Sequence, residues 1–162
     1  MKNLDILGVT KNTEVIVSDT MVATLGGRVI HPLLSSCALI QEMEWASRLT
    51  IIDYLDNEED AMGTKIVLNH IKPTPVGMKI KICATIIEIE GEKINCKVEA
   101  FSDFGLIADG CVEQTVVKKN WLEAKIQKLN TLVSPNGVPY ILSISTRLRP
   151  GILLASGKWV LK

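Results

Sequence analysis

Histidine is the side chain that most often acts as a general base near neutral pH, and this chain contains only two, His31 and His70. His70 ends an alternating segment whose two-residue period places it on the same face as Ile66 and Leu68. A histidine among inward-facing residues needs a hydrogen-bonding partner or a chemical role. His31 lies in a segment rich in turn residues, and we interpret it as a surface residue.

Glu44 is the acidic residue best placed to work with a histidine. It adjoins Met43, which belongs to an apolar stripe with helical spacing, and an acid close to such a stripe is costly unless it is paired or functional. Glu42 lies about 200° around the same helix, so the two carboxylates do not share a role easily. A partly exposed glutamate at the border of the helix remains the alternative interpretation of Glu44.

Two serines, Ser35 and Ser36, precede the helical segment, and either suits a helix N-cap because a serine oxygen accepts from the first-turn amides. Ser36 could instead supply a reacting hydroxyl. Ser36 and Glu44 would be about 12 Å apart along a continuous helix, too far for a direct pair of nucleophile and base. Either Ser36 lies in a loop before the helix, or the site is assembled differently, for example across a dimer interface.

The elements that must position these residues follow from hydrophobic periodicity. One helix is predicted within residues 33–55, where apolar residues recur at steps of three and four: Leu39, Ile40, Met43, Ala46, Leu49, Ile52 and Leu55. A strand at 13–17 and a loop at 18–32 are predicted before it, and an acidic surface loop at 56–63 after it. Alternating segments from 64 to 118 predict three or four long antiparallel strands. The fold class is therefore α+β, a long central helix wrapped by an antiparallel sheet.

Composition limits the classes of function. The chain has 162 residues, 47% of them apolar, and 18 basic residues balance 18 acidic ones, so no basic field would attract nucleic acid or anionic lipid. No leader peptide or membrane span is expected, which makes the cytoplasm the default location. The cysteines form no CxxC pair or Cys/His cluster, so we expect buried free thiols and no metal site: Cys37, Cys83, Cys96 and Cys111.

Residues 131–162 differ in composition from the rest of the chain. They contain no acidic residue, three prolines and three glycines, and four basic residues: Arg147, Arg149, Lys158 and Lys162. Prolines and glycines interrupt long elements, so the segment is predicted to be a poorly ordered C-terminal extension, with an edge strand possible at 140–145. The main domain is predicted to span residues 1–130.

Three blocks of sequence resemble the bacterial fluoroacetyl-CoA thioesterase family and its broader thioesterase relatives. The blocks are SSCALIQEMEWA (35–46), MGTKIVLNHIKPTPVG (62–77) and GLIADGCVEQTVV (105–117), and the resemblance extends over residues 10–128. It implies a hotdog fold and an acyl-CoA thioesterase that hydrolyses an acyl thioester to the free acid and coenzyme A.

The resemblance also implies a set of site residues. Glu44 and His70 fall on the family's catalytic glutamate and histidine, and Ser36 falls on its catalytic threonine. Gly63 corresponds to a glycine near the thioester, and the backbone amides of Ser36, Cys37 and Ala38 are candidate donors to an oxyanion. Glu44 would either orient the histidine or attack the carbonyl itself, and both roles stay open.

One departure bears on the substrate. The family's fluoroacetyl-specific enzyme has a phenylalanine-bearing lid before the helix, whereas residues 21–34 here contain no aromatic residue. We therefore expect a small or medium acyl group rather than fluoroacetyl selectivity, and no cofactor besides the coenzyme A of the substrate. Hotdog proteins generally pair with their sites at the interface, so the resemblance implies a homodimer or a dimer of dimers.

Two other functions stay open at this point. A hotdog hydratase or dehydratase would act on enoyl or hydroxyacyl thioesters, but such enzymes usually carry a nearby aspartate and histidine that neither His31 nor His70 displays. A non-catalytic acyl-CoA binding module would keep the pocket without turnover. The presence of a hydroxyl, a carboxylate and an imidazole at matching positions favours the thioesterase.

Overall fold

The computed structural model describes residues 5–132, 152–153 and 159–160. The chain divides into two compact units, residues 1–119 and 120–162, and each is described by itself. The predicted boundary near residue 130 stays a prediction. The predicted disorder of 131–162 and the possible strand at 140–145 fall almost entirely outside the described residues.

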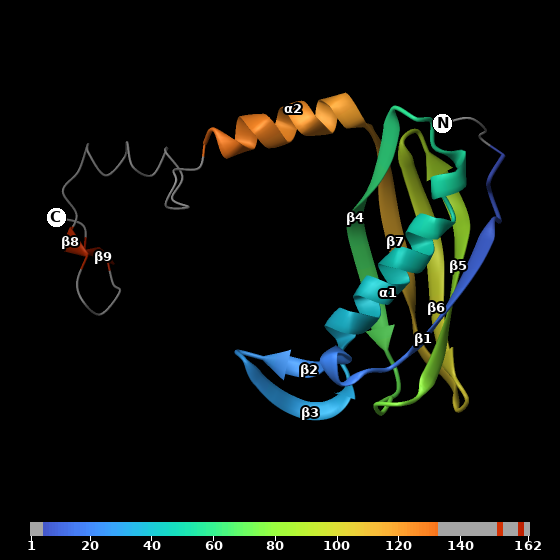
Figure 1. Cartoon of the computed structure of the whole chain (residues 1–162). Coiled ribbons are helices and arrows are strands. Elements are labelled where there is room, and N and C mark those ends of the chain that lie inside the picture. Colours follow the sequence, from blue (N-terminus) through green and yellow to red (C-terminus); the bar gives the residue numbers. More distant parts are fainter. Residues whose placement is uncertain (1–4, 133–151, 154–158, 161–162) are drawn as a thin grey trace. The chain divides into compact units, whose positions relative to one another are not determined.

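The first unit is built on a five-stranded antiparallel sheet (Figure 1). Its strands in chain order are β1 (Thr10–Ile16), β4 (Glu59–His70), β5 (Lys79–Glu90), β6 (Lys93–Ser102) and β7 (Gly105–Lys118). The spatial order is β1-β5-β6-β7-β4, which leaves β1 and β4 at the two edges. The prediction of three or four long antiparallel strands between residues 64 and 118 is thus confirmed, and the structure has four, β4 to β7. Gly91, at φ 59°, permits the turn from β5 to β6.

Helix α1 (Ser36–Leu49) crosses one face of this sheet (Figure 1). Ser35 is its N-cap, and the Ser35 hydroxyl accepts a hydrogen bond of 3.0 Å from the Ala38 amide. The helix ends earlier than the predicted residue 55, because the amide and the hydroxyl of Thr50 both donate to the Ser47 carbonyl. A short 3-10 turn, η2 (Ile52–Tyr54), follows.

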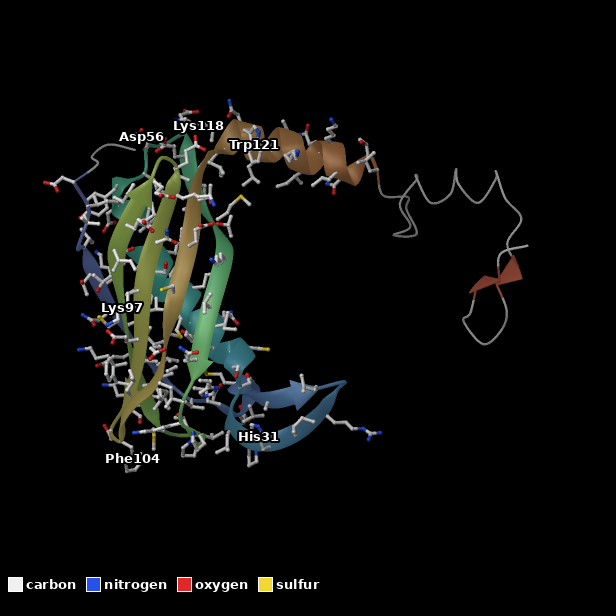
Figure 2. All side chains as sticks on the ribbon, turned by 180° about the vertical axis from the view of Figure 1, so that it is seen from behind. His31, Asp56, Lys97, Phe104, Lys118 and Trp121 are labelled. Atoms are coloured by element: carbon white, nitrogen blue, oxygen red, sulfur yellow. The ribbon has the colours of Figure 1, made fainter. Side chains whose placement is uncertain are left out.

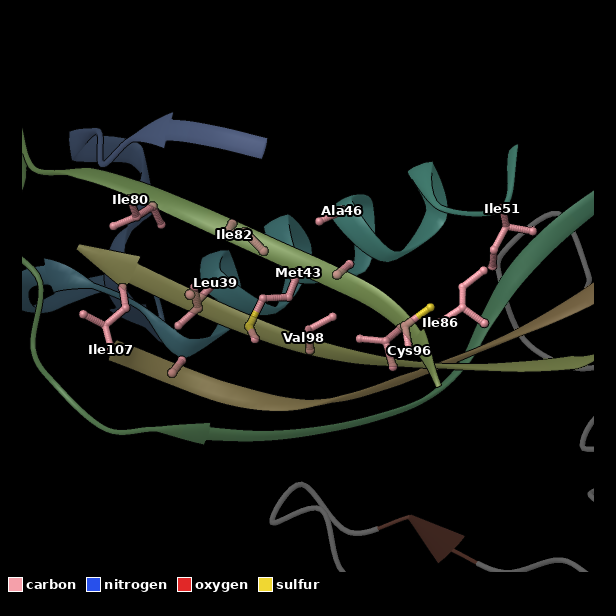
Figure 3. Close-up of a cluster of buried hydrophobic side chains, with 14 of the residues drawn as sticks. Leu39, Met43, Ala46, Ile51, Ile80, Ile82, Ile86, Cys96, Val98 and Ile107 are labelled. Atoms are coloured by element: carbon pink, nitrogen blue, oxygen red, sulfur yellow. The ribbon is translucent and has the colours of Figure 1, made fainter. Parts of the chain in front are cut away.

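The core lies between α1 and the sheet (Figure 3). Leu39, Met43 and Ala46 form the buried stripe of the helix, as its periodicity predicts. Alternate residues of β5 and β6, such as Ile82 and Val98, face them from the sheet. Each large aliphatic side chain buried in this way contributes about 1.5–3 kcal/mol. The predicted α+β architecture is confirmed, and the packing holds α1 rigidly across the strands.

The prediction of a loop at residues 18–32 is wrong in one respect, because most of this segment forms a β-hairpin. A 3-10 turn, η1 (Asp19–Met21), leads into β2 (Val22–Leu25) and β3 (Arg28–Leu34). Gly26 and Gly27, at φ 57° and 75°, form the two-residue turn that residues with a side chain would adopt at a cost. His31 therefore lies on β3, where it is exposed as predicted (Figure 2).

The predicted acidic loop at 56–63 is also shorter than expected, since β4 begins at Glu59. Glu59 is only 8% exposed and pairs in register with Lys118 of β7, whose ammonium lies 2.9 Å from the carboxylate. The ion pair compensates the charge of Glu59, so this acidic residue can be part of the sheet. The strand therefore includes Gly63, which was predicted to be the last residue of that loop.

The four cysteines are free, but only Cys96 is buried. Cys83 is half-buried, and Cys37 and Cys111 are exposed. The expectation of buried thiols is wrong for these two because Cys37 lies on the first turn of α1 and Cys111 on the outward face of β7.

The described part of the second unit consists of most of helix α2 (Lys119–Asn130) and two short paired strands, β8 (Ile152–Leu153) and β9 (Trp159–Val160). Trp121, Ile126 and Leu129 of α2 are exposed. No helix in the described ranges is long and apolar enough to span a membrane.

Candidate active site

Ser36 and His70 come together although they are 34 positions apart in the chain. The Ser36 hydroxyl oxygen lies 3.0 Å from Nδ1 of His70, within hydrogen-bonding distance. Two elements create the contact: Ser36 is the first residue of α1, and His70 is the last residue of β4. The alternation predicted for β4 is confirmed, because Ile66, Leu68 and His70 are half-buried while the residues between them are exposed.

The second ring nitrogen of His70 is free to act. Its Nε2 atom is buried and has no hydrogen-bond partner within the described part of the chain. With Nδ1 bound to a hydroxyl, the tautomer is set by which atom donates in that bond. A neutral imidazole with one unused nitrogen can accept or deliver a proton at that position.

A cavity of about 740 Å³ opens beside this pair. The β2–β3 hairpin, the start of α1 and the segment after β4 form its walls, and they contribute Leu25, His31, Ser36, Cys37, Ala38, His70 and Lys72 among others. Four of the predicted site residues thus share one cavity: Ser36, Cys37, Ala38 and His70. His31, interpreted from sequence as a surface residue without a role, also lines it.

Capping narrows the set of backbone donors at the start of α1. The Ala38 amide is bound by the Ser35 hydroxyl, and the Leu39 amide by the Ser35 carbonyl. Helix geometry leaves the amides of Ser36 and Cys37 without a carbonyl inside the helix. Of the three amides predicted as oxyanion donors, these two are the ones available to a ligand.

Glu44 lies further along α1, against Gly63 of β4. A side-chain carbon built on Gly63 would overlap the Glu44 carboxylate, coming within 2.9 Å of its Cδ atom. Gly63 does not have a positive φ, so its backbone alone does not require glycine. What the missing side chain permits is the close approach of the Glu44 carboxylate to the strand.

This carboxylate belongs to a second, smaller cavity of about 260 Å³. The cavity is lined by Gln41, Glu44, Trp45, Arg48, Ala61, Gly63 and Gln114. Gln41 lines both cavities, so they adjoin along α1. The structure therefore separates the predicted residues into two groups, one with Ser36 and His70 and the other with Glu44 and Gly63.

Arg48 is the positively charged residue of the smaller cavity, and its charge is largely compensated by a neighbouring carboxylate. Its guanidinium donates to the Ala61 carbonyl and to the Asp60 carboxylate. Partial burial opposes ionisation of Asp60, but the hydrogen bond and charge of Arg48 outweigh it and hold the pKa of Asp60 below its usual value. Glu44 is thus the unpaired ionisable group in the lining of this cavity as the structure describes it.

A family model described as fluoroacetyl-CoA-specific thioesterase matches residues 17–120, more than half of the chain. The chain belongs to the fluoroacetyl-CoA-specific thioesterase family. The matched range includes every residue that lines the two cavities.

A curated relative of this family, the fluoroacetyl-CoA thioesterase of Streptantibioticus cattleyicolor, is 29% identical over 86 residues. These residues are 53% of this chain and 62% of the relative, so the match spans less than two thirds of that protein's length.

Solved structures of thioesterases and hotdog proteins share the fold. A hypothetical protein of Thermus thermophilus, described as a thioesterase superfamily member, is 26% identical with a TM-score of 0.77, covering 81% of this chain and 96% of its own. A fluoroacetyl-CoA thioesterase is 21% identical with a TM-score of 0.71, covering 75% and 95%. A hot-dog-like protein from Thermanaerovibrio acidaminovorans is 18% identical with a TM-score of 0.73, covering 79% and 96%. The predicted hotdog fold is confirmed.

Sequence reasoning missed three polar residues of the smaller cavity, Gln41, Arg48 and Gln114. Gln114 occupies an inward position of β7 between the buried Val112 and Val116, so a polar residue interrupting that apolar alternation was the available signal. Arg48 follows Glu44 by four positions, which places both on one side of the helix. Arg48 does not depart from ordinary surface composition, and only the cavity that it shares with Glu44 and Gln114 distinguishes it.

Proposed function

We propose that the protein is an acyl-CoA thioesterase that hydrolyses a small or medium acyl thioester to the free acid and coenzyme A. The observation that carries this proposal is the Ser36–His70 contact of 3.0 Å at the wall of a cavity. The N-terminus of α1 forms part of the same wall. Membership of the thioesterase family supports the same reaction class.

Hydrolysis needs a base, a nucleophile and donors for the developing oxyanion. The proton of a water molecule would pass to Nε2 of His70 as the water oxygen bonds to the thioester carbonyl carbon. The Ser36 hydroxyl, bound to Nδ1, would orient the ring. The amides of Ser36 and Cys37 would donate to the carbonyl oxygen as it becomes negative. When the carbon–sulfur bond breaks, the departing thiolate would take the proton back from His70.

Glu44 has two possible roles in this scheme. Its carboxylate can polarise the attacking water, or it can attack the carbonyl carbon to give an anhydride that water then hydrolyses. Because Ser36 and Glu44 of one chain lie about 12 Å apart along α1 and line different cavities, either role would be at the thioester held beside the partner subunit's His70 in the dimer proposed below.

The two cavities suggest how the substrate would divide between them. The larger cavity of one subunit would take the thioester and the adjoining part of coenzyme A, and the smaller cavity of its partner, at about 260 Å³, suits a small acyl group. One related fluoroacetyl-CoA-specific thioesterase is known in complex with fluoroacetate and coenzyme A. The hairpin over the larger cavity contains no aromatic residue, and we therefore do not assign fluoroacetyl selectivity.

We further propose a homodimer, alone or within a dimer of dimers, that pairs along β4. This strand is 12 residues long and forms an edge of the sheet, and an unpaired edge with exposed apolar residues such as Val67 favours pairing. Ser36 is the first residue of α1 and not part of a preceding loop, which favours a site completed across an interface. Light scattering at micromolar concentration should give twice the chain mass or more, and a monomer would contradict the dimer.

The reaction would need no cofactor, because coenzyme A arrives as part of the substrate. We propose the cytoplasm as its location. The four free cysteines, two of them exposed, fit a reducing compartment.

A thiol-release assay over acyl-CoAs of different length and polarity tests the proposal. His70→Ala and Glu44→Gln should each reduce kcat/KM by roughly 10²–10⁴-fold, the usual contribution of a positioned acid or base. Asn69→Ala is the matched control, since Asn69 adjoins His70 on the outward face of β4 and bonds Asp109. Parental activity in both site variants would contradict the site.

Two outcomes would favour other functions. Tight acyl-CoA binding without thiol release over hours would indicate a binding module. Hydration of an enoyl-CoA, without thiol release, would indicate a hydratase.

A further inference from the structure

Gln114 is a buried amide without an internal partner. Its side chain belongs to a residue that is 1% exposed, and neither Oε1 nor Nε2 has a hydrogen-bond partner within the described part of the chain. Leaving such a group unpaired in the interior is unfavourable. The nearby strands do not require a glutamine here, since Val112 and Val116 fill the equivalent inward positions of β7. The amide is therefore available to a ligand.

The register of the sheet directs Gln114 toward the acyl end of the proposed site. Gln114 pairs with Gly63 of β4, and residues paired across antiparallel strands project on the same face. Gly63 is the residue against which the Glu44 carboxylate lies. Because Gly63 has no side chain, it leaves space beside Gln114, and both residues line the cavity of about 260 Å³.

The charge of this cavity limits what the amide could bind. Glu44 is acidic, and Arg48 is paired with Asp60, so the three groups together are negative. A ligand carrying its own carboxylate would meet repulsion from Glu44. A neutral group that both donates and accepts hydrogen bonds fits better, because Oε1 of Gln114 needs a donor and Nε2 an acceptor.

We propose that Gln114 selects acyl groups that carry a neutral hydroxyl, so that the substrates are short hydroxyacyl thioesters of coenzyme A. Gly63, which pairs with Gln114, is seven residues from His70 on β4, about 23 Å at the usual strand rise, so the two ends of the acyl group would contact different subunits of the proposed dimer. The hydroxyl would donate to Oε1 and accept from Nε2 of Gln114 in one subunit, and the thioester would lie beside His70 of the partner subunit. This inference rests on the proposed thioesterase function and adds the class of acyl group. Gln114 is a specificity residue and takes no part in bond breaking.

The test compares thiol release from acyl-CoAs of one chain length. Butyryl-CoA, 2-hydroxybutyryl-CoA, 3-hydroxybutyryl-CoA and succinyl-CoA have four-carbon acyl groups that differ in polarity and charge. The wild-type protein should hydrolyse at least one hydroxybutyryl thioester with a kcat/KM tenfold or more above that of butyryl-CoA, and should hydrolyse succinyl-CoA least. A site that bonds a substrate hydroxyl rejects the analogue without it because its own polar atoms are then left unpaired.

Gln114→Leu removes the amide while keeping similar volume. It should abolish the preference, lowering kcat/KM for the hydroxyacyl thioester and keeping or raising that for butyryl-CoA. Gln127→Leu, the same change on the exposed surface of α2, should leave the ratio unaltered. Thermal unfolding checks that both variants fold, and Gln114→Met supplies a second apolar variant if Gln114→Leu does not.

The outcomes separate the two proposals. If the wild-type protein hydrolyses butyryl-CoA as well as or better than both hydroxybutyryl thioesters, or if Gln114→Leu keeps the preference, the selection by Gln114 is wrong while the thioesterase function stands. If the wild-type protein releases no thiol from any acyl-CoA of the panel, the thioesterase function is wrong and the selection falls with it.

Discussion

The two cavities along α1 are built from different kinds of chemistry. The larger one combines a hydroxyl, an imidazole and helix amides, groups that bind or transfer protons at a carbonyl. The smaller one combines a carboxylate, an arginine held by Asp60, and a buried amide without a partner. The larger cavity thus has the groups that a thioester requires, and the smaller has groups able to discriminate among acyl chains. Changes in the larger cavity, and changes that remove or displace the Glu44 carboxylate, should alter the rate, whereas changes at Gln114 and around Arg48 should alter which substrate reacts.

Gly63→Ala is expected to have the largest effect among the variants considered next. The new methyl group would displace the Glu44 carboxylate, which is the flexible end of a side chain and can move without unfolding the protein. A misplacement of about 1 Å at a reacting group can cost 10²-fold, so we expect kcat/KM to fall by about that factor with little change in stability.

Gly110→Ala gives the contrasting result, because its methyl group would collide with the Val67 backbone carbonyl, which cannot move aside. It should lower the free energy of unfolding, measured by urea denaturation. If Gly63→Ala lost stability as Gly110→Ala does and kept its activity, Gly63 would serve packing alone.

Ser36→Ala should have an intermediate effect, about tenfold on kcat, because it removes the hydroxyl that holds His70 while leaving the ring in place. Ser35→Ala is the matched control on the adjacent residue. Ser35 caps the helix, so that variant should lose about 1 kcal/mol of stability and little activity. If both variants lowered stability equally and neither lowered kcat, Ser36 would be a structural serine.

The residues of the larger cavity could be foreseen in part. The alternation of β4 indicated that His70 faces inward, and the stripe of Leu39, Met43 and Ala46 located the helix that carries Ser36 and Glu44. Pattern could not decide between Ser35 and Ser36 as the cap, because both precede the same helix and only the Ala38 bond distinguishes them.

Tertiary contacts explain why other features escaped prediction. The hairpin at Gly26 and Gly27 lacks the alternating apolar residues that reveal a half-buried strand, since much of it is exposed. Gln114 becomes notable only when its neighbours across the sheet are known. The two cavities were not predicted, although the eight positions between Ser36 and Glu44 did predict that these side chains form no direct pair.

The smallest expected effect concerns the charges behind the smaller cavity. The pKa of Asp60 is lowered in the folded protein by Arg48, so the ionised carboxylate stabilises the fold above its unfolded pKa of about 4, and this contribution is lost as the pH falls through the lower folded value. Asp60→Asn should therefore cost under about 1 kcal/mol at pH 7, since the pair is partly exposed, and the difference from wild type should shrink below about pH 4.

Urea unfolding at several pH values measures this difference, and Glu14→Gln is its control. Glu14 also has a lowered pKa, owing to its hydrogen bond and charge interaction with Lys79, but it lies on β1 at the opposite edge of the sheet from β4. Both variants should lose stability near neutral pH. Only Asp60→Asn frees Arg48 beside Glu44, so only that variant should raise the activity toward succinyl-CoA relative to butyryl-CoA. An equal response of the two variants would mean that the charge of the smaller cavity does not govern which acyl group reacts.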